Sequence, residues 1–180
     1  MHSEAEPTLD LNNAPATLFL FGLAGGGKSY VGNLIGRLAG WQVYDADDDL
    51  TDEMQLALAE HRPFTPPMRE RFFAIVIEKI LQLQKQYPKL VVTQAVYKQQ
   101  HRDYLLAHIP HMELICVTAD DAVIFRRINK RSAGITIESA AALRADFEAP
   151  VSDCKIIVND NGAADIIEQL NRFYSASTTR

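Results

Sequence analysis

A glycine-rich segment at residues 22–29 carries the clearest chemistry in the sequence. It matches the pattern Gly-x-x-x-x-Gly-Lys-Ser, directly after an apolar run and directly before apolar residues at helical spacing. Glycines in such a loop let successive backbone N–H groups turn toward phosphate oxygens, and the N-terminus of the helix adds partial positive charge. The lysine reaches the β- and γ-phosphates, and the serine hydroxyl holds Mg²⁺. The segment therefore predicts binding of ATP and Mg²⁺ by these residues: Gly22, Gly25, Gly26, Gly27, Lys28, Ser29 and Tyr30.

A cluster of carboxylates follows the next apolar run, at residues 45–49. Asp45 and Asp47 are two apart, and at the end of an expected strand their side chains can point in different directions. We expect Asp45 to join the Mg²⁺ shell and Asp47 to address an acceptor hydroxyl that awaits attack. Asp48 and Asp49 have a structural interpretation, because either of them could cap the helical segment that follows.

Two arginines near the end of the helical segment 120–131 are further candidates. Arg127 and Arg131 lie four apart, and a guanidinium can stack on adenine or neutralise charge that grows on a transferred phosphoryl group. Either arginine could take either role; we place Arg127 at the nucleotide, and Arg131 with Lys28 in the catalytic step. The alternative is a solvated basic helix end that complements its own dipole. Residues 132–134 break the pattern, so the segment 131–136 is expected to be mobile and to order when nucleotide binds.

Lys98 and Arg102 are also four apart, on a helix that begins after an expected strand. Two cations at this spacing share one side of a helix, so they could hold a carboxylate or phosphate of the acceptor. Simple exposure to solvent is nearly as good an interpretation of the pair.

Five short apolar runs alternate with longer segments of helical spacing. The runs lie at residues 18–22, 41–44, 90–95, 113–118 and 155–158, and the longest helical segment lies at 69–86. This alternation predicts an α/β fold with a mostly parallel sheet, in which ligands bind beyond the carboxyl ends of the strands. The glycine-rich loop and the aspartates both follow such ends.

Length and composition fit one globular domain. The chain has 180 residues, of which 47% are hydrophobic and 23% charged. We expect flexible tails at residues 1–16 and 175–180 and a folded domain at 17–174. Residues 1–16 are polar, acidic and interrupted by Pro7 and Pro15, and residues 175–180 have no apolar residue large enough to anchor them.

Charge and apolar patterning restrict the partners. A formal net charge of −5 and dispersed basic residues argue against nucleic acid. The first apolar run is too short to span a membrane and follows an acidic segment, so we expect a cytoplasmic protein, a monomer or homodimer, that acts on a small molecule. Cys116 and Cys154 are interpreted as small apolar residues in or beside strands.

Taken together, these segments resemble the gluconokinases, with shikimate kinases as more distant relatives, over most of the chain. The resemblance rests on the glycine-rich loop, Asp45-x-Asp47-Asp48, Arg62-Pro63-Phe64, Arg69, Ala95-Val96-Tyr97-Lys98, Arg102-Asp103, Arg127, Arg131 and Phe147-Glu148-Ala149-Pro150. It implies a three-layer P-loop kinase fold, with a five-stranded mostly parallel sheet flanked by helices. It also implies that MgATP phosphorylates gluconate or a related sugar acid, that Asp45 lies in the magnesium shell, and that Asp47 contacts or deprotonates the acceptor. Arg69, Lys98 and Arg102 would face that acceptor.

Several positions depart from the gluconokinase pattern, and all of them lie on the acceptor side. Gluconokinases usually carry a histidine soon after the aspartates, acidic residues before the arginine and His-Phe in the lid. Here the corresponding residues are Leu50, Pro66, Met68, Gly134 and Ile135. A kinase of the shikimate, nucleotide or dephospho-coenzyme A type therefore stays open as an alternative. Residues 157–162 are similar to the final strand and turn of nucleotide kinases and dephospho-coenzyme A kinases. A non-catalytic ATP-binding sensor is an alternative of another class.

Overall fold

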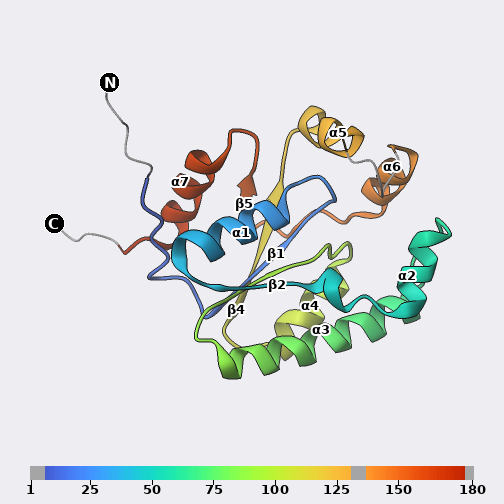
Figure 1. Cartoon of the computed structure of the whole chain (residues 1–180), viewed down its shortest axis with the longest axis horizontal. Helices are drawn as coiled ribbons and strands as arrows, with labels where there is room; N and C mark the ends of the chain where they lie inside the picture. The colour runs from blue at the N-terminus through green and yellow to red at the C-terminus, as the bar shows by residue number, and fades with distance from the viewer. Residues whose placement is uncertain (1–6, 131–136, 177–180) are drawn as a thin grey trace.

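A five-stranded parallel sheet forms the centre of the molecule (Figure 1). The computed structural model describes residues 7–130 and 137–176. The strands stand in the order β2-β3-β1-β4-β5, and every neighbouring pair is parallel. Their bounds are β1 (Thr17–Phe21), β2 (Gln42–Asp45), β3 (Leu90–Thr93), β4 (Met112–Thr118) and β5 (Lys155–Val158). The predicted fold class is confirmed, and each predicted strand appears within about two residues of its expected place.

Helices cover both faces of the sheet. Figure 1 shows α1 and α7 on one face and α3 and α4 on the other. Alternate residues of β1 supply the two cores, because Phe19 and Phe21 pack toward α3 while Leu18 and Leu20 pack toward α1 and α7. The helical elements are α1 (Lys28–Ala39), the 3-10 turn η1 (Ala46–Asp49), α2 (Asp52–Ala59), α3 (Pro66–Gln86), α4 (Gln99–His108), α5 (Asp121–Asn129), α6 (Ile137–Asp146) and α7 (Ala163–Tyr174).

Two threonines set the starts of α2 and α3. The Thr51 hydroxyl accepts a hydrogen bond from the backbone N–H of Met54, so it is the cap of α2. The expectation that Asp48 or Asp49 caps this helix is therefore wrong, and Asp49 instead accepts a hydrogen bond from the Tyr44 hydroxyl. Thr65 caps α3 in the same way, with prolines in the first turn, where a missing N–H costs nothing. The helix therefore begins three residues before the expected Arg69.

Part of the N-terminal segment packs against α7, which the sequence did not predict. Leu11 is 7% exposed and lies in the same core as α1 and α7. Asn171 fastens the segment by accepting from the Asp10 N–H at 2.8 Å and donating to the Thr8 carbonyl at 2.8 Å. Leu11 and Asn171 therefore help to hold residues 8–11 against α7, although the composition of this segment predicts a flexible tail. Residues 1–6 and 177–180 lie outside the described residues.

Candidate active site

The glycine-rich loop runs from the end of β1 to the start of α1 in a backbone conformation that only glycine allows. Gly27 caps α1 with φ 91°, and a Cβ there would lie 2.0 Å from Nδ2 of Asn159. Gly22 has φ 151°, and a Cβ there would lie 2.2 Å from the Val117 carbonyl oxygen. The loop is thus pressed against β4 and the end of β5, with Lys28 and Ser29 opening the helix.

Arg127 and Asn159 hold the far side of this loop. Arg127 donates to the carbonyl of Gly25 at 3.0 Å and to the carbonyl of Asn159 at 2.8 Å. The Asn159 side chain, which is buried, donates to the Gly26 carbonyl at 3.2 Å. Side chains of α5 and of the residue after β5 therefore donate hydrogen bonds to carbonyl groups of the loop. These bonds support a loop conformation that is formed before a ligand binds. Arg127 lies at the predicted nucleotide side, whereas Arg131 and the predicted mobile segment lie outside the described residues.

Asp45 and Asp47 stand at the carboxyl end of β2, as expected. Asp45 is half-buried and accepts a hydrogen bond from the Asp47 N–H at 3.0 Å. Burial is the main cause that raises the pKa of Asp45, and the negative charges of Asp47 and Asp48 add to it while Lys28 opposes it. Asp47 is exposed and accepts a hydrogen bond from Nε2 of Gln94 at 2.8 Å. Gln94 was not predicted, because a glutamine after a strand belongs to none of the recognised patterns.

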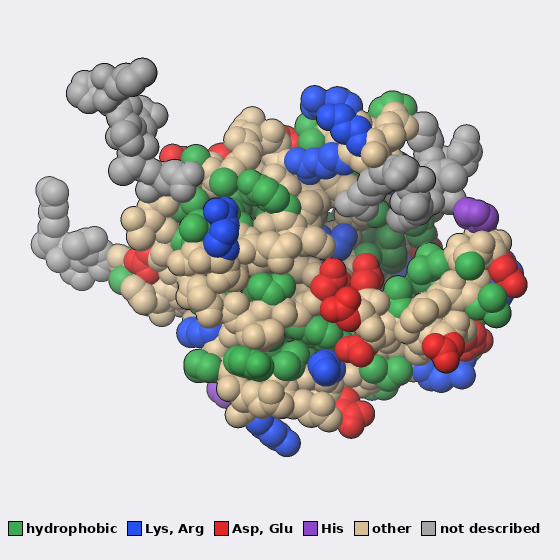
Figure 2. All heavy atoms as spheres, viewed as in Figure 1, with side chains coloured by type: hydrophobic (Ala, Val, Ile, Leu, Met, Phe, Trp, Pro, Cys, Tyr) green, Lys and Arg blue, Asp and Glu red, His purple; other side chains and the backbone are tan. Residues whose placement is uncertain are grey.

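One large cavity joins the loop to the aspartates and to α2 and α3. Its volume is about 1240 Å³. Figure 2 shows the hollow, with hydrophobic side chains inside it and acidic side chains gathered at one edge. The predicted site residues that line it are Gly25, Gly27, Lys28, Ser29, Tyr30, Asp45, Asp47, Arg69 and Arg127. Gly22 and Gly26 also belong to the loop, but they are buried and are not among the cavity-lining residues.

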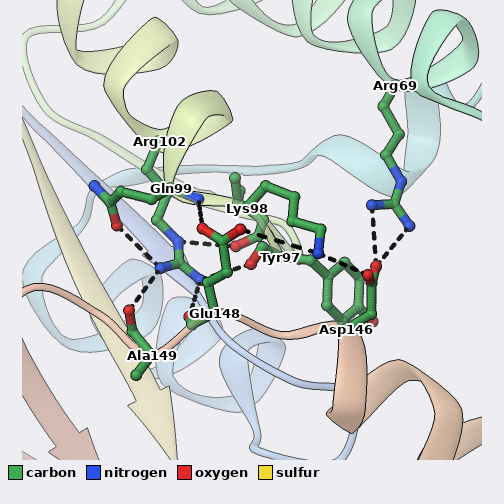
Figure 3. A network of polar contacts seen from close by, with 9 residues as sticks. Arg69, Tyr97, Lys98, Gln99, Arg102, Asp146, Glu148 and Ala149 are labelled. Atoms are coloured by element: carbon green, nitrogen blue, oxygen red, sulfur yellow. Dashed lines mark hydrogen bonds and ion pairs between the residues drawn. The ribbon is translucent and has the colours of Figure 1, made fainter.

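Arg69 reaches this cavity while it pairs with Asp146 from α6 (Figure 3). Both terminal nitrogens of Arg69 lie 3.3 Å from one carboxylate oxygen of Asp146. Lys98 contacts the other oxygen at 2.7 Å. Hydrogen bonds from Lys98 and then Arg69 lower the pKa of Asp146, although burial opposes them. Lys98 is not among the cavity-lining residues, so the structure brings Arg69 to the acceptor side without it.

Arg102 differs from its expectation, because its guanidinium is buried away from the cavity. The residue is 1% exposed and donates to the backbone carbonyls of Val96 at 2.9 Å, Tyr97 at 3.2 Å and Glu148 at 2.7 Å. Its guanidinium carbon lies 4.5 Å from the Phe21 ring centroid. These contacts join α4 to the segment after α6 (Figure 3), so Arg102 supports the site's wall and is not among the cavity-lining residues.

Tyr97 and His101 also line the acceptor side and were not predicted as site residues. Tyr97 lies beneath Arg69, whose guanidinium carbon is 5.6 Å from the Tyr97 ring centroid. His101 packs on Phe73 with ring centroids 4.9 Å apart. Burial is the main cause that lowers the pKa of His101, and the charge of Arg69 adds to it. The expected helix through Lys98 and Arg102 includes His101, but helical spacing alone does not indicate which side of that helix faces the cavity.

The donors at this edge of the sheet suit a hydrated Mg²⁺ beside a nucleotide. Mg²⁺ commonly takes one or two protein oxygens and completes its shell with phosphates and water. The Ser29 hydroxyl and the Asp45 carboxylate line the same cavity. Beside Asp45 in the sheet lies Thr93, a cavity-lining residue whose buried hydroxyl has no hydrogen-bond partner among the described residues. A cation-bound water is the kind of group that such a hydroxyl would bind.

Comparisons with known proteins agree with this geometry. No model of a known protein family matches the chain. Over 93 residues the chain is 30% identical to a protein from Mus musculus named probable gluconokinase, a match that covers 52% of this chain and 50% of that protein. The chain thus spans about half the length of the curated relatives it matches.

Solved structures match over nearly the whole chain. A sugar kinase from Janibacter superposes with a TM-score of 0.74 at 20% identity, covering 92% of this chain and 94% of that one. A gluconokinase from Sinorhizobium meliloti superposes with a TM-score of 0.72 at 19% identity, covering 89% and 94%. The chain has the P-loop kinase fold. Its resemblance to gluconokinases is confirmed, and a shikimate kinase follows at a TM-score of 0.59.

Within the part of the chain that the structure describes, no helix is long and apolar enough to cross a membrane.

Proposed function

We propose that this chain transfers the γ-phosphoryl group of ATP to a hydroxyl of a small anionic metabolite. The observation that carries the proposal is the single cavity that joins Lys28 and Ser29 to Asp47 and Arg69. A phosphotransferase must bring donor and acceptor together in one water-restricted space, and this cavity is large enough for both. The names of the sequence relatives and the P-loop kinase fold support the same class of reaction.

Each residue has a defined part in this proposal. Lys28 and the loop N–H groups bind the phosphates, and Arg127 steadies the loop on its far side. Ser29 and Asp45 would hold Mg²⁺, which would neutralise charge on the phosphates. Asp47 accepts the proton of the attacking hydroxyl, and Gln94 orients its carboxylate. Arg69 pairs with an anionic group of the acceptor.

The acceptor is tested by measuring ADP release across several classes of alcohol. Gluconate enters as the reference, because it is the first candidate from sequence, beside other sugar acids, shikimate, nucleoside monophosphates and dephospho-coenzyme A. The Lys28→Ala variant serves as the blank. Release that depends on both an acceptor and Lys28 supports the proposal. If every acceptor is inert while ATP still binds, the chain is a nucleotide sensor and the proposal fails.

A further inference from the structure

The acceptor end of the cavity has an apolar wall. The residues that form it come from the segment after η1, from α2, from the loop that follows and from α3. They are Leu50, Met54, Leu58, Phe64, Phe72 and Phe73. Figure 2 shows hydrophobic side chains within this hollow, next to the acidic side chains of its edge. The wall is therefore built from apolar side chains, which offer no hydrogen-bonding group stronger than the Met54 thioether.

Leu58 distinguishes this wall from ordinary core packing. It is 49% exposed even though it lines the cavity, whereas Met54, one turn earlier on the same side of α2, is 1% exposed. Leu56 is 53% exposed as well, but it is not among the cavity-lining residues. Leu58 thus leaves apolar surface open inside the cavity, where a ligand would cover it.

Polar groups at this end are few. Arg69, Tyr97 and His101 line it, and His61 and Arg62 line the cavity from the loop before α3, where Arg62 pairs with Glu60. Lys98 and Arg102, which were expected to join them, do not line it. Burial lowers the pKa of His101, which disfavours a second positive charge beside Arg69. The apolar wall itself offers no strong hydrogen-bond partner, so a polyol that lay along it would leave hydroxyl groups unpaired. A hydroxyl buried against the apolar wall without a partner would weaken binding.

We propose that the acceptor is a monoanionic alcohol built on an apolar ring, and that such a compound is preferred over a sugar acid. The ring lies against the wall, the anion pairs with Arg69, and the hydroxyl reaches Asp47. In the transfer, the hydroxyl oxygen forms a bond to the γ-phosphorus and the bond from that phosphorus to the β,γ-bridging oxygen breaks. ADP leaves, and the hydroxyl proton passes to the Asp47 carboxylate. The inference rests on the proposed phosphotransfer and narrows its acceptor.

Two matched compounds test the preference. 4-(Hydroxymethyl)benzoate and D-gluconate each carry one carboxylate and one primary hydroxyl, but only the first has an apolar ring. We expect kcat/KM with MgATP to be at least ~10-fold higher for the ring compound, the scale at which an apolar pocket discriminates. An equal or higher value for gluconate, while transfer still requires Lys28, would overturn the inference and leave the proposed phosphotransfer standing.

A matched pair of variants locates the preference at the wall. Leu58→Gln places a polar group in the cavity, and Leu56→Gln makes the same change on the same helix outside it. We expect Leu58→Gln to lower kcat/KM for the ring compound about 5- to 10-fold and to narrow its advantage over gluconate. Leu56→Gln should leave both values unchanged. Equal losses in the two variants would overturn the assignment of the wall.

Calorimetry separates this inference from the reaction itself. Binding of both compounds is measured in the presence of Mg²⁺ and a non-hydrolysable ATP analogue. If the ring compound binds more tightly but neither compound is phosphorylated, the preference of the site holds and the phosphotransfer proposal fails. If the ring compound binds no better than gluconate, the inference is wrong whatever the rate of transfer.

Discussion

The side-chain amide of Gln94 donates a hydrogen bond to the Asp47 carboxylate, with Nε2 2.8 Å from Oδ1. The amide oxygen of Gln94 accepts from the Ala95 N–H at 2.7 Å, which determines the orientation of the side chain. Gln94 is 8% exposed, so it has little freedom to move. Gln94, directly after β3, therefore orients the carboxylate of Asp47, the proposed general base in the turn after β2.

Replacing Gln94 by Met should slow the chemical step more than it weakens nucleotide binding. The variant keeps the size of the side chain but loses the donor, so Asp47 is no longer held in one orientation. We expect kcat to fall about 10-fold or more with the Kd for MgATP within about 2-fold of the parent. Rates and calorimetric affinities measured side by side decide this, and an unchanged kcat would make Gln94 a structural residue only.

Asp45→Asn and Asp47→Asn should have different effects. Asp45 is assigned to the metal, so its variant should need a higher Mg²⁺ concentration for half-maximal rate. Asp47 is assigned to the acceptor hydroxyl, so its variant should lose about 100-fold or more in kcat while MgATP still binds. Magnesium titrations of both variants test the assignment. If the two variants respond alike to Mg²⁺, the separate roles of the two aspartates are not supported.

Arg102→Ala should destabilise the fold. The change leaves the carbonyls of Val96, Tyr97 and Glu148 without their buried donor and removes the cation beside Phe21. We expect the free energy of unfolding to fall by about 2–4 kcal/mol, because buried acceptors are left unpaired. Arg172→Ala, at an exposed position on α7, should change it by less than about 0.5 kcal/mol. Urea denaturation compares the two, and equal effects would contradict the structural role of Arg102.

Stability should fall as the pH drops below about 6.5, in part because of His101. Burial lowers the pKa of His101 in the folded state, whereas the unfolded chain titrates near the ordinary value of 6.5. Below that pH the unfolded state binds more protons than the folded state. The contribution of His101 to the free energy of unfolding is therefore complete above pH 6.5 and is lost as the pH falls through the folded pKa. His101→Phe, which keeps a ring against Phe73, should flatten this slope between pH 5 and 7. His108→Gln, at an exposed position, should not.

The elements and the nucleotide side could be predicted because their signals are local. An apolar run followed by glycines, lysine and serine specifies strand, loop and helix within about a dozen residues, and Gly27 shows why the glycine is required. The start of α3 was missed for an equally local reason: two prolines look like a break, but after the Thr65 cap they are favourable at the first turn.

The acceptor side could not be predicted, because distant residues decide it. Lys98 and Arg102 are four apart, yet Asp146 pairs with the first and the carbonyl of Glu148 accepts from the second, some 46 residues away in the sequence. Spacing along one helix indicates that two cations share a side of it, but it does not indicate which residues of other segments they contact. Gln94 was missed for the same reason, since its role depends on the carboxylate of Asp47 in the turn that follows the neighbouring strand β2.

The most direct test of the proposed function follows the labelled γ-phosphoryl group of ATP. The acceptor most active in the ADP-release screen is incubated with Mg²⁺, labelled ATP and the parent chain, Lys28→Ala or Asp47→Asn. The label should appear on the acceptor with the parent chain, be lost with Lys28→Ala, and fall about 100-fold with Asp47→Asn while that variant still binds MgATP. Label that appears only in inorganic phosphate, or that reaches the acceptor equally well with Lys28→Ala, would contradict phosphotransfer at this site.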